Sequence, residues 1–292
     1  MPDPTQMAGA ISKSQENTRG LSLHIGMNCV DAGHYNGWTG ELTSCENDAN
    51  AMAEIARLCG FESQCLKSAE ATRDKVTQAI EAAADRLPAD GLFWVSYSGH
   101  GGQVYDVDGD EADGKDDTWC LYDAQLLDDE LHVLFSRFKP GSRVLVLSDS
   151  CHSGTLLKGE RKTPVAASSV EDDFIHPRAM PRSAAIDVSR AQRGFYATIQ
   201  QGLPHPRPRI GATVRLLSGC REDQESFGSA TMGRFTSAVQ TVYANGAFEG
   251  DYAAFVQQLI KTVARAMNPQ TPGQMVIGAT NRDFDRQKPF TI

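Results

Sequence analysis

The sequence predicts an α/β protein, a three-layer sandwich in which helices cover both faces of a mainly parallel β-sheet. Short apolar runs alternate along the chain with segments whose apolar residues recur at helical spacing, as in right-handed βαβ units. Two of the apolar runs end in small residues that lead to His100 and Cys151. Sites of such sheets lie at the carboxyl ends of the strands, so we expect this pair at one sheet edge.

The first predicted elements alternate between strand and helix. Leu21–Asn28 is a short apolar run and the first expected strand. A helix is predicted over Glu46–Cys59 from its apolar spacing, and Gly60 ends it. Phe61–Leu66 is the second expected strand. Thr72 is suited to cap the next helix, which carries an apolar stripe as far as residue 87.

The next two strands lead to the histidine and the cysteine. They are expected over Leu92–Tyr97 and Val144–Leu147, both continuous apolar runs. An acidic loop is predicted after the first of them, at residues 106–117. Asp128 or Asp129 can then cap a short helix before the second strand.

The amino-acid composition of the chain changes after Cys151. Residues 158–212 are rich in Pro, Arg, Ser and Ala, and we predict a long, partly disordered loop insertion there. Order is expected to return with a strand over Val214–Ser218, helices around Phe235–Tyr243 and from Asp251, and a last strand over Met275–Ala279. Residues 1–20 are predicted to be a flexible N-terminal leader, and residues 21–292 to form one domain.

Charge and composition argue against several classes of function. The net charge of −9 disfavours nucleic acid or an anionic membrane as the main partner. No run approaches the roughly 18 apolar residues of a membrane span, and the first 20 residues lack the apolar core of a signal peptide. These features predict a cytoplasmic protein. The seven cysteines form no CxxC pair, so free thiols are expected and a zinc site is not.

Cys151 and His100 have the chemistry of a nucleophile and its partner. A nearby imidazole raises the thiolate fraction of a cysteine and later protonates the leaving amine. The backbone N–H groups of Gly101 and Cys151 are candidate oxyanion donors. His152 is a competing histidine, but a residue adjacent to the nucleophile normally points elsewhere. The alternative for Cys151 is a buried structural thiol, which its polar neighbours disfavour.

Five sequence blocks carry a resemblance to a known family. They are Leu23–Asn28, Cys45–Ala49, Tyr97–Gln103, Asp149–Gly154 and Ser218–Ser226. In these blocks the chain resembles the metacaspases and their prokaryotic relatives, within the caspase-like clan of cysteine peptidases. The 51-residue separation of the histidine and the cysteine fits the roughly 50 residues of caspase-like proteases. The resemblance covers residues 21–292 except 158–212. It implies a caspase-like sandwich and an endopeptidase that needs no cofactor for its chemistry.

The resemblance also implies a class of substrate. In metacaspases the aspartate of the Cys-x-x-Asp block and the aspartate two residues before the nucleophile line the specificity pocket. Here these are Asp48 and Asp149, with Cys45 and Ser98 at further pocket positions. Two carboxylates bind Arg or Lys of a protein substrate, and bidentate geometry favours Arg. Asp48 is also an acidic first-turn residue of a helix, and both roles can hold together.

A calcium site is the remaining implication. Calcium-dependent metacaspases use aspartates that match Asp116, Asp128 and Asp129, together with a fourth whose place Lys158 takes here. This cation damages the site unless Glu160 or water compensates. Helix capping is the alternative role of the second and third aspartates, so calcium remains open.

The insertion offers sites for self-processing, with a plain solvated loop as the alternative. Its basic residues include Arg161, Lys162, Arg178, Arg182, Arg190 and Arg193. Gly228 stands where the family places an aspartate beyond the Ser218–Ser226 block, which leaves the pocket role of that block open. A separate activating protein could supply regulation. Two rival functions are a catalytically silent scaffold with a peptidase fold and a calcium-binding regulator.

Overall fold

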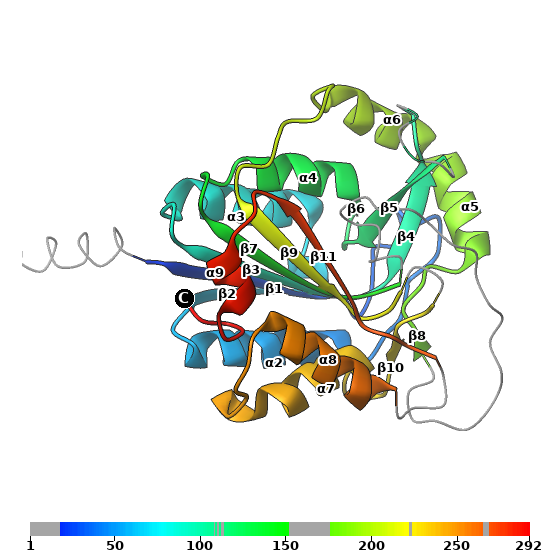
Figure 1. The fold of residues 1–292 in the computed structure, drawn as a ribbon. Helices are drawn as coiled ribbons and strands as arrows, with labels where there is room; N and C mark the ends of the chain where they lie inside the picture. The colour runs from blue at the N-terminus through cyan, green and yellow to red at the C-terminus, as the bar shows by residue number, and fades with distance from the viewer. Residues whose placement is uncertain are drawn as a thin grey trace, which may run out of the picture.

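The computed structural model of this chain describes residues 18–107, 109, 111, 114–151, 176–221, 224–264 and 269–292. At its centre is a six-stranded sheet with the order β11-β9-β7-β3-β1-β2 (Figure 1). The strands are β1 Gly20–Gly26, β2 Glu62–Lys67, β3 Leu92–Ser98, β7 Arg143–Asp149, β9 Thr213–Ser218 and β11 Gly273–Gly278. All neighbours run parallel except β11, which is antiparallel to β9. The predicted α/β fold with a mainly parallel sheet is confirmed.

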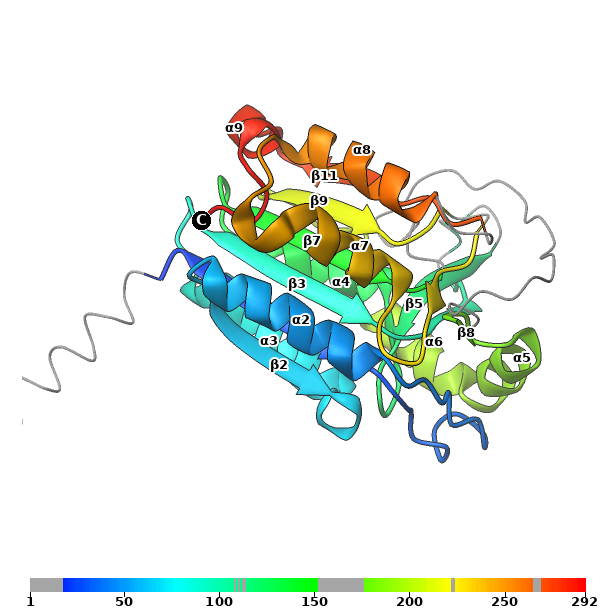
Figure 2. The ribbon, with the colours of Figure 1, turned by 90° about the horizontal axis from the view of Figure 1, so that it is seen from below.

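Helices cover both faces of this sheet (Figure 2). One face carries α2 Cys45–Leu58, α7 Arg234–Tyr243 and α8 Tyr252–Val263, and the other carries α3 Arg73–Arg86 and α4 Asp128–Ser136. Leu92 and Trp94 of β3 pack toward the first group, whereas Phe93 and Val95 pack toward the second. Side chains of a strand alternate between its faces, so one apolar run serves two cores. The short helix α9 Arg282–Arg286 adds a buried phenylalanine to the first core.

The helix ends follow local chemistry, with one correction. Thr72 is the predicted N-cap of α3, and Asp251, where a helix is expected to begin, is the N-cap of α8. Each side chain accepts the N–H three residues on, at 3.3 and 2.8 Å. Gly60 follows α2 with φ of +87°. The expectation that Asp128 or Asp129 caps α4 is wrong. Both carboxylates lie inside its first turn, and the cap position precedes them.

A small second sheet lies beyond the carboxyl end of β3. Its strands are β4 Gly101–Tyr105, β5 Lys115–Cys120 and β6 Gln125–Leu127, all antiparallel. The acidic segment predicted as a loop is therefore partly strand, and Asp116 and Asp117 of β5 are buried. Only two residues separate β3 from β4, so the link that contains His100 is held at both ends.

Two helices occupy much of the segment predicted as a loop insertion. They are α5 Arg182–Ala191 and α6 Arg193–Gly202, so the loop expectation is wrong for this part. The prolines that suggested a loop flank the two helices instead of interrupting them. Val188 and Tyr196 anchor the helices in the core. Within the described residues, no helix has the length and apolar content needed to cross a membrane.

Candidate active site

The structure brings His100 and Cys151 to the same edge of the sheet. β3 and β7 are parallel neighbours, and Ser98 is paired in register with Asp149. His100 and Cys151 each lie two residues beyond this pair. Both side chains are buried. The parallel register therefore sets the histidine opposite the cysteine, as the two strand ends predict.

Two backbone N–H groups at this edge converge on one carbonyl oxygen. Gly101 N and Cys151 N donate to the carbonyl oxygen of Arg178, at 2.9 and 3.1 Å. Two preorganised donors on one carbonyl have the geometry of an oxyanion hole. A Cβ atom at Gly101 would lie 1.8 Å from the carbonyl oxygen of Cys151, so only glycine allows this approach.

The imidazole of His100 lies in an enclosed, aromatic environment. Its ring centroid is 4.9 Å from that of Trp38. The pKa of His100 is lowered to about 4, first by burial and then by the Arg178 guanidinium, while backbone hydrogen bonds with Ala179 and Gly40 oppose the shift. The imidazole is therefore neutral at pH 7, which is the form that accepts a proton.

The thiol of Cys151 contacts a loop that follows β9. Ser226 N donates to its Sγ atom at 3.1 Å. Cys220 is also adjacent, and hydrogen bonding with Cys151 is the first cause of the raised pKa of the Cys220 thiol. Both contacts come from the Ser218–Ser226 block, whose role the sequence leaves open. This block therefore lies against the candidate nucleophile.

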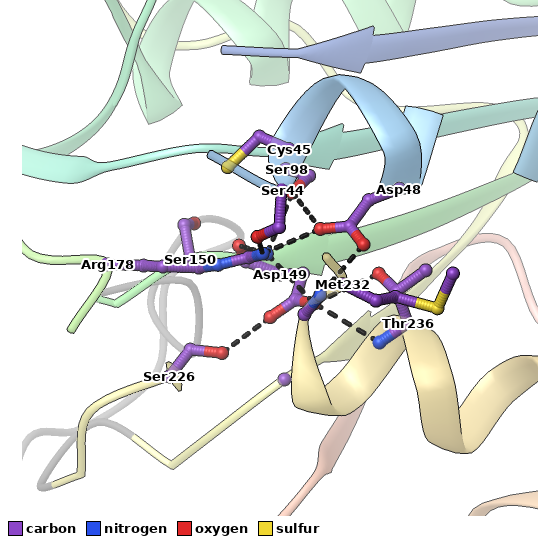
Figure 3. A network of polar contacts seen from close by, with 12 residues as sticks. Ser44, Cys45, Asp48, Ser98, Asp149, Ser150, Arg178, Ser226, Met232 and Thr236 are labelled. Carbon is purple, nitrogen blue, oxygen red and sulfur yellow. Dashed lines mark hydrogen bonds and ion pairs between the residues drawn. The ribbon is translucent and has the colours of Figure 1, made fainter. Parts of the chain in front are cut away.

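The carboxylates of Asp48 and Asp149 both lie against the guanidinium of Arg178 in a buried pocket (Figure 3). Arg178 fills the space between them: its Nη2 lies 2.6 Å from an oxygen of Asp48 and its Nη1 lies 3.0 Å from an oxygen of Asp149. The guanidinium also donates to the hydroxyls of Ser98 and Ser44, at 2.7 and 3.0 Å. Arg178 is 0% exposed. The two predicted carboxylates thus hold an arginine that belongs to the same chain.

Neutral donors from distant segments hold the two carboxylates. Asp48 accepts from the Ser98 hydroxyl and from Gly233 N, at 2.7 and 2.8 Å. Asp149 accepts from the hydroxyl of Ser226 at 2.5 Å, and from the N–H and hydroxyl of Thr236 at 3.1 and 3.0 Å. These donors hold both carboxylates in place around the guanidinium.

The charges of this pocket favour a guanidinium in spite of its burial. Burial lowers the pKa of Arg178, but the carboxylates of Asp149 and Asp48 outweigh burial and leave that pKa raised. Burial raises the pKa of Asp48, and Arg178 opposes this shift. The predicted pocket residue Cys45 is fully buried, and burial raises its pKa to about 11. Cys45 is therefore a neutral wall beside the two carboxylates.

Glycines leave room for the guanidinium. A Cβ atom at Gly228 would lie 3.1 Å from Nη2 of Arg178, and one at Gly233 would lie 2.6 Å from the same atom. Gly228 stands where the family resemblance suggested an aspartate. Its place in the structure is against the arginine, so a longer side chain there would compete for the same space.

The amino-acid sequence matches the family described as Caspase domain over residues 29–285. The chain belongs to the caspase family. Metacaspase-1 of Kluyveromyces lactis is 37% identical over 269 residues, with 80% of this chain and 60% of the relative covered. Metacaspase-1 of Mycosarcoma maydis is 32% identical and covers 74% of this chain, again over 60% of its own length. The chain thus spans about 60% of the length of these relatives.

Two solved structures place this caspase-family chain among similar folds. Protein GSU0716 from Geobacter sulfurreducens is 42% identical, with a TM-score of 0.81 and coverage of 94% of this chain and 98% of that one. Caspase-1 from Spodoptera frugiperda has a TM-score of 0.54 at 12% identity, with 89% of each chain covered. The second likeness concerns the fold alone.

The three aspartates of the implied calcium site are also brought together in this caspase-family chain. Asp116, Asp128 and Asp129 are buried and each offers an oxygen within 4.8 Å of the others. Oxygen donors of this kind suit Ca²⁺. Arg207 contacts Asp129 through Nε at 2.6 Å and also through Nη2. A guanidinium that sequence reasoning missed therefore already neutralises part of the cluster.

Several predicted residues lie outside the described part of the chain. These are His152, Lys158, Glu160, Arg161 and Lys162. Sequence reasoning missed Trp38, Ser44, Gly233 and Thr236. A serine directly before the first helix residue is a local sign that could have identified Ser44. The other three residues lie in segments whose local sequence gives no sign that they contact His100 or the Asp48–Asp149 pocket.

Proposed function

We propose that this caspase-family chain is a cysteine endopeptidase that cleaves proteins after arginine, with lysine as a poorer alternative. One observation carries the proposal. The guanidinium of Arg178 lies on Asp48 and Asp149, while its carbonyl oxygen accepts from the N–H groups of Gly101 and Cys151. A substrate arginine in the same position would have its scissile carbonyl directly beside the thiol.

The residues divide the chemistry between them. Neutral His100 accepts the proton of the Cys151 thiol, and the thiolate attacks the carbonyl carbon of the substrate arginine. The N–H groups of Gly101 and Cys151 stabilise the negative charge that develops on the carbonyl oxygen. The protonated imidazole then donates to the leaving amine. Arginine is favoured over lysine because its two terminal nitrogens reach separate carboxylates.

A peptide substrate panel tests this proposal. Fluorogenic peptides that differ only in Arg, Lys or Asp at the cleavage site are incubated with the purified protein and with Cys151→Ala. We expect turnover in the order Arg, Lys, then Asp, and none in the variant. An Asp substrate would place a third carboxylate beside Asp48 and Asp149, which is electrostatically unfavourable. Turnover of the Asp peptide equal to that of the Arg peptide would contradict the pocket assignment. A protein that hydrolyses none of the peptides would favour a scaffold role.

We further propose that Ca²⁺ binds the cluster of Asp116, Asp128 and Asp129 in competition with Arg207. The support is the close approach of three carboxylates together with the guanidinium contact on Asp129. Calorimetric titration with Ca²⁺ tests this proposal, and the peptide assay with Ca²⁺ or a chelator tests whether the ion changes turnover. Absence of any binding heat would contradict it.

A further inference from the structure

A buried glutamine outside the pocket holds the loop that lies against the thiol. Gln270 is located between α8 and β11 and is only 3% exposed. Its Nε2 donates to the carbonyl oxygen of Gly219 at 2.9 Å and to the hydroxyl of Ser226 at 3.1 Å, and its Oε1 accepts from Phe227 N at 3.3 Å. Both amide hydrogens and the amide oxygen are therefore used by the chain that follows β9.

The chemistry of these partners fixes the orientation of the Gln270 amide. The carbonyl oxygen of Gly219 only accepts hydrogen bonds, and Phe227 N only donates. An amide turned by half a rotation would set its oxygen against a carbonyl oxygen and its nitrogen against an N–H group. Ser226 gives its own hydroxyl hydrogen to Asp149, so its oxygen is the acceptor for Gln270 (Figure 3). The hydrogen bonds thus run in one direction, from Gln270 through Ser226 to Asp149.

Ser226 contacts three different parts of the candidate active site. Its backbone N–H donates to Sγ of Cys151 at 3.1 Å, its hydroxyl donates to Asp149 at 2.5 Å, and its carbonyl oxygen accepts from Arg178 N at 2.9 Å. The first contact favours the thiolate, because a hydrogen bond to the charged form of a group stabilises that form. The position of one loop residue therefore affects the nucleophile and the pocket together.

We propose that Gln270 is a positioning residue of the peptidase, which holds Ser226 where its N–H supports the Cys151 thiolate and its hydroxyl orients Asp149 toward an arginine. The inference deepens the proposed function and rests on it, since it concerns the same thiol and pocket. Because the Gln270 amide is fully used by the loop, this residue acts through Ser226 and not on the substrate directly.

A link that only stabilises the loop is the alternative role of Gln270. The link is anchored beside the nucleophile, because Gly219 N donates to the carbonyl oxygen of Ser148 in β7 at 2.8 Å. Gln270 therefore sets the position of Ser226 relative to the strand that leads to Cys151. A stabilising link alone would change only the free energy of unfolding. A positioning residue also changes the reactivity of the thiol and the charge preference of the pocket.

Two substitutions remove the donor in different ways. Gln270→Met keeps the length of the side chain and removes its hydrogen bonds. Gln270→Glu has nearly the same shape and keeps an oxygen for Phe227 N, but its second oxygen accepts the Ser226 hydroxyl hydrogen that otherwise goes to Asp149. Gln257→Met, at an exposed position of α8, is the matched control. Thermal unfolding followed by circular dichroism identifies the variants that are folded.

The first measurement follows the thiol without any substrate. The rate of alkylation by iodoacetamide is measured over a range of pH, and the alkylated residue is located by peptide mass mapping. Access to the thiol scales the whole profile, whereas the thiolate fraction sets its midpoint. We expect the midpoint for Cys151 to rise by about one pH unit in Gln270→Met. A larger rise is expected in Gln270→Glu, whose negative charge also opposes the thiolate.

The second measurement follows the pocket. Peptides with Arg or its neutral analogue citrulline at the cleavage site are compared by the ratio of their kcat/KM values. We expect this ratio to fall about threefold in Gln270→Met, because Asp149 is held less firmly. Ser226→Ala alone should lower the ratio at least as much. In the Ser226→Ala background, Gln270→Met should leave the ratio unchanged, because the hydroxyl that links Gln270 to Asp149 is absent.

The outcomes separate this inference from the proposed function. An unchanged midpoint and an unchanged ratio in a folded Gln270 variant would overturn the inference and leave the function intact. Equal changes in Gln257→Met would do the same. A wild-type protein that hydrolyses no Arg peptide would overturn the proposed function. The alkylation midpoint would then still decide whether Gln270 holds the loop against the thiol, since this measurement needs no peptidase activity.

Discussion

Asp48→Asn tests how the pocket selects arginine. The substitution keeps the shape of the side chain and removes its negative charge. In the structure an oxygen of Asp48 lies 2.6 Å from Nη2 of Arg178, and both side chains are almost fully buried. A substrate arginine in the same place would lose one of its two ion pairs. The contact to Asp149 would remain.

The expected magnitude follows from the burial of the pair. Removal of one partner of a buried, hydrogen-bonded charge pair at an interface costs about 2–5 kcal/mol. We take the lower end, about 2 kcal/mol, because Asp149 still neutralises the guanidinium. At 1.4 kcal/mol per factor of ten, this is about a 30-fold loss of kcat/KM for arginine substrates.

The assay compares two peptides that differ only in charge. Citrulline has nearly the shape of arginine but is neutral, so the ratio of kcat/KM for the Arg and citrulline peptides isolates the electrostatic contribution. This ratio does not depend on the fraction of molecules whose pocket is free. Asp187→Asn, at an exposed position of α5, is the matched control. An unchanged ratio in Asp48→Asn, with folding confirmed by circular dichroism, would refute the reasoning.

Three further predictions concern the oxyanion donors, a buried histidine and the acidic cluster. Gly101→Ala places a Cβ atom 1.8 Å from the carbonyl oxygen of Cys151. Because this clash displaces the Gly101 N–H from the oxyanion hole, kcat should fall about 100-fold or more. The control is Gly194→Ala, which has open space around it and should leave kcat unchanged. Burial, with a smaller contribution from Arg57, lowers the pKa of His24 to about 3, so the native state keeps this residue neutral while the unfolded state takes up a proton below about pH 6.5. In urea denaturation, the free energy of unfolding should therefore fall as the pH drops below that value, by about 1.4 kcal/mol per pH unit. This dependence should be weaker in His24→Gln but unchanged in His205→Gln, whose histidine is exposed. The same pH dependence of stability in all three proteins would be inconsistent with a neutral buried His24. Arg207→Gln removes the guanidinium from Asp129 and should tighten Ca²⁺ binding in a calorimetric titration, and weaker binding would show that Arg207 does not compete with the ion.

The sequence was sufficient to predict the sheet and the edge that carries the site. Continuous apolar runs identify buried parallel strands, and parallel strands place their carboxyl ends together. His100, Cys151, Ser98 and Asp149 all lie at such ends, so one rule accounts for their meeting. Asp48 is added by the helix that packs beside β1 and β3.

The parts that escaped prediction depend on contacts distant in the sequence. Gly233 contributes a backbone N–H to Asp48, and Thr236 contributes both its N–H and its hydroxyl to Asp149. Backbone donors leave no mark in residue type, so no local pattern could identify them. Arg178 is one of the six basic residues named in the predicted insertion, and its contacts with Asp48 and Asp149, both distant in the sequence, place it in the pocket.

Composition misled the prediction in two segments for physical reasons. Prolines flank α5 and α6 without entering them. The high proline content of residues 158–212 as a whole therefore led us to predict a loop where two helices form. The acidic run before Trp119 suggested a solvated loop, yet Asp116 and Asp117 are buried in β5. Buried carboxylates become favourable only through tertiary partners such as the Arg207 contact on Asp129, and single-sequence patterns do not contain such partners.

An activity-based probe tests the central claim most directly, because it needs the nucleophile and the pocket together. Peptidyl acyloxymethyl ketones with Arg or Asp at the recognition position are incubated with the purified protein, and the modified residue is located by peptide mass mapping. We expect the Arg probe to alkylate Cys151, with neither probe labelling Cys220, and the Asp probe to react far more slowly. Labelling of another cysteine, or equal labelling by the two probes, would contradict a Cys151 nucleophile served by Asp48 and Asp149.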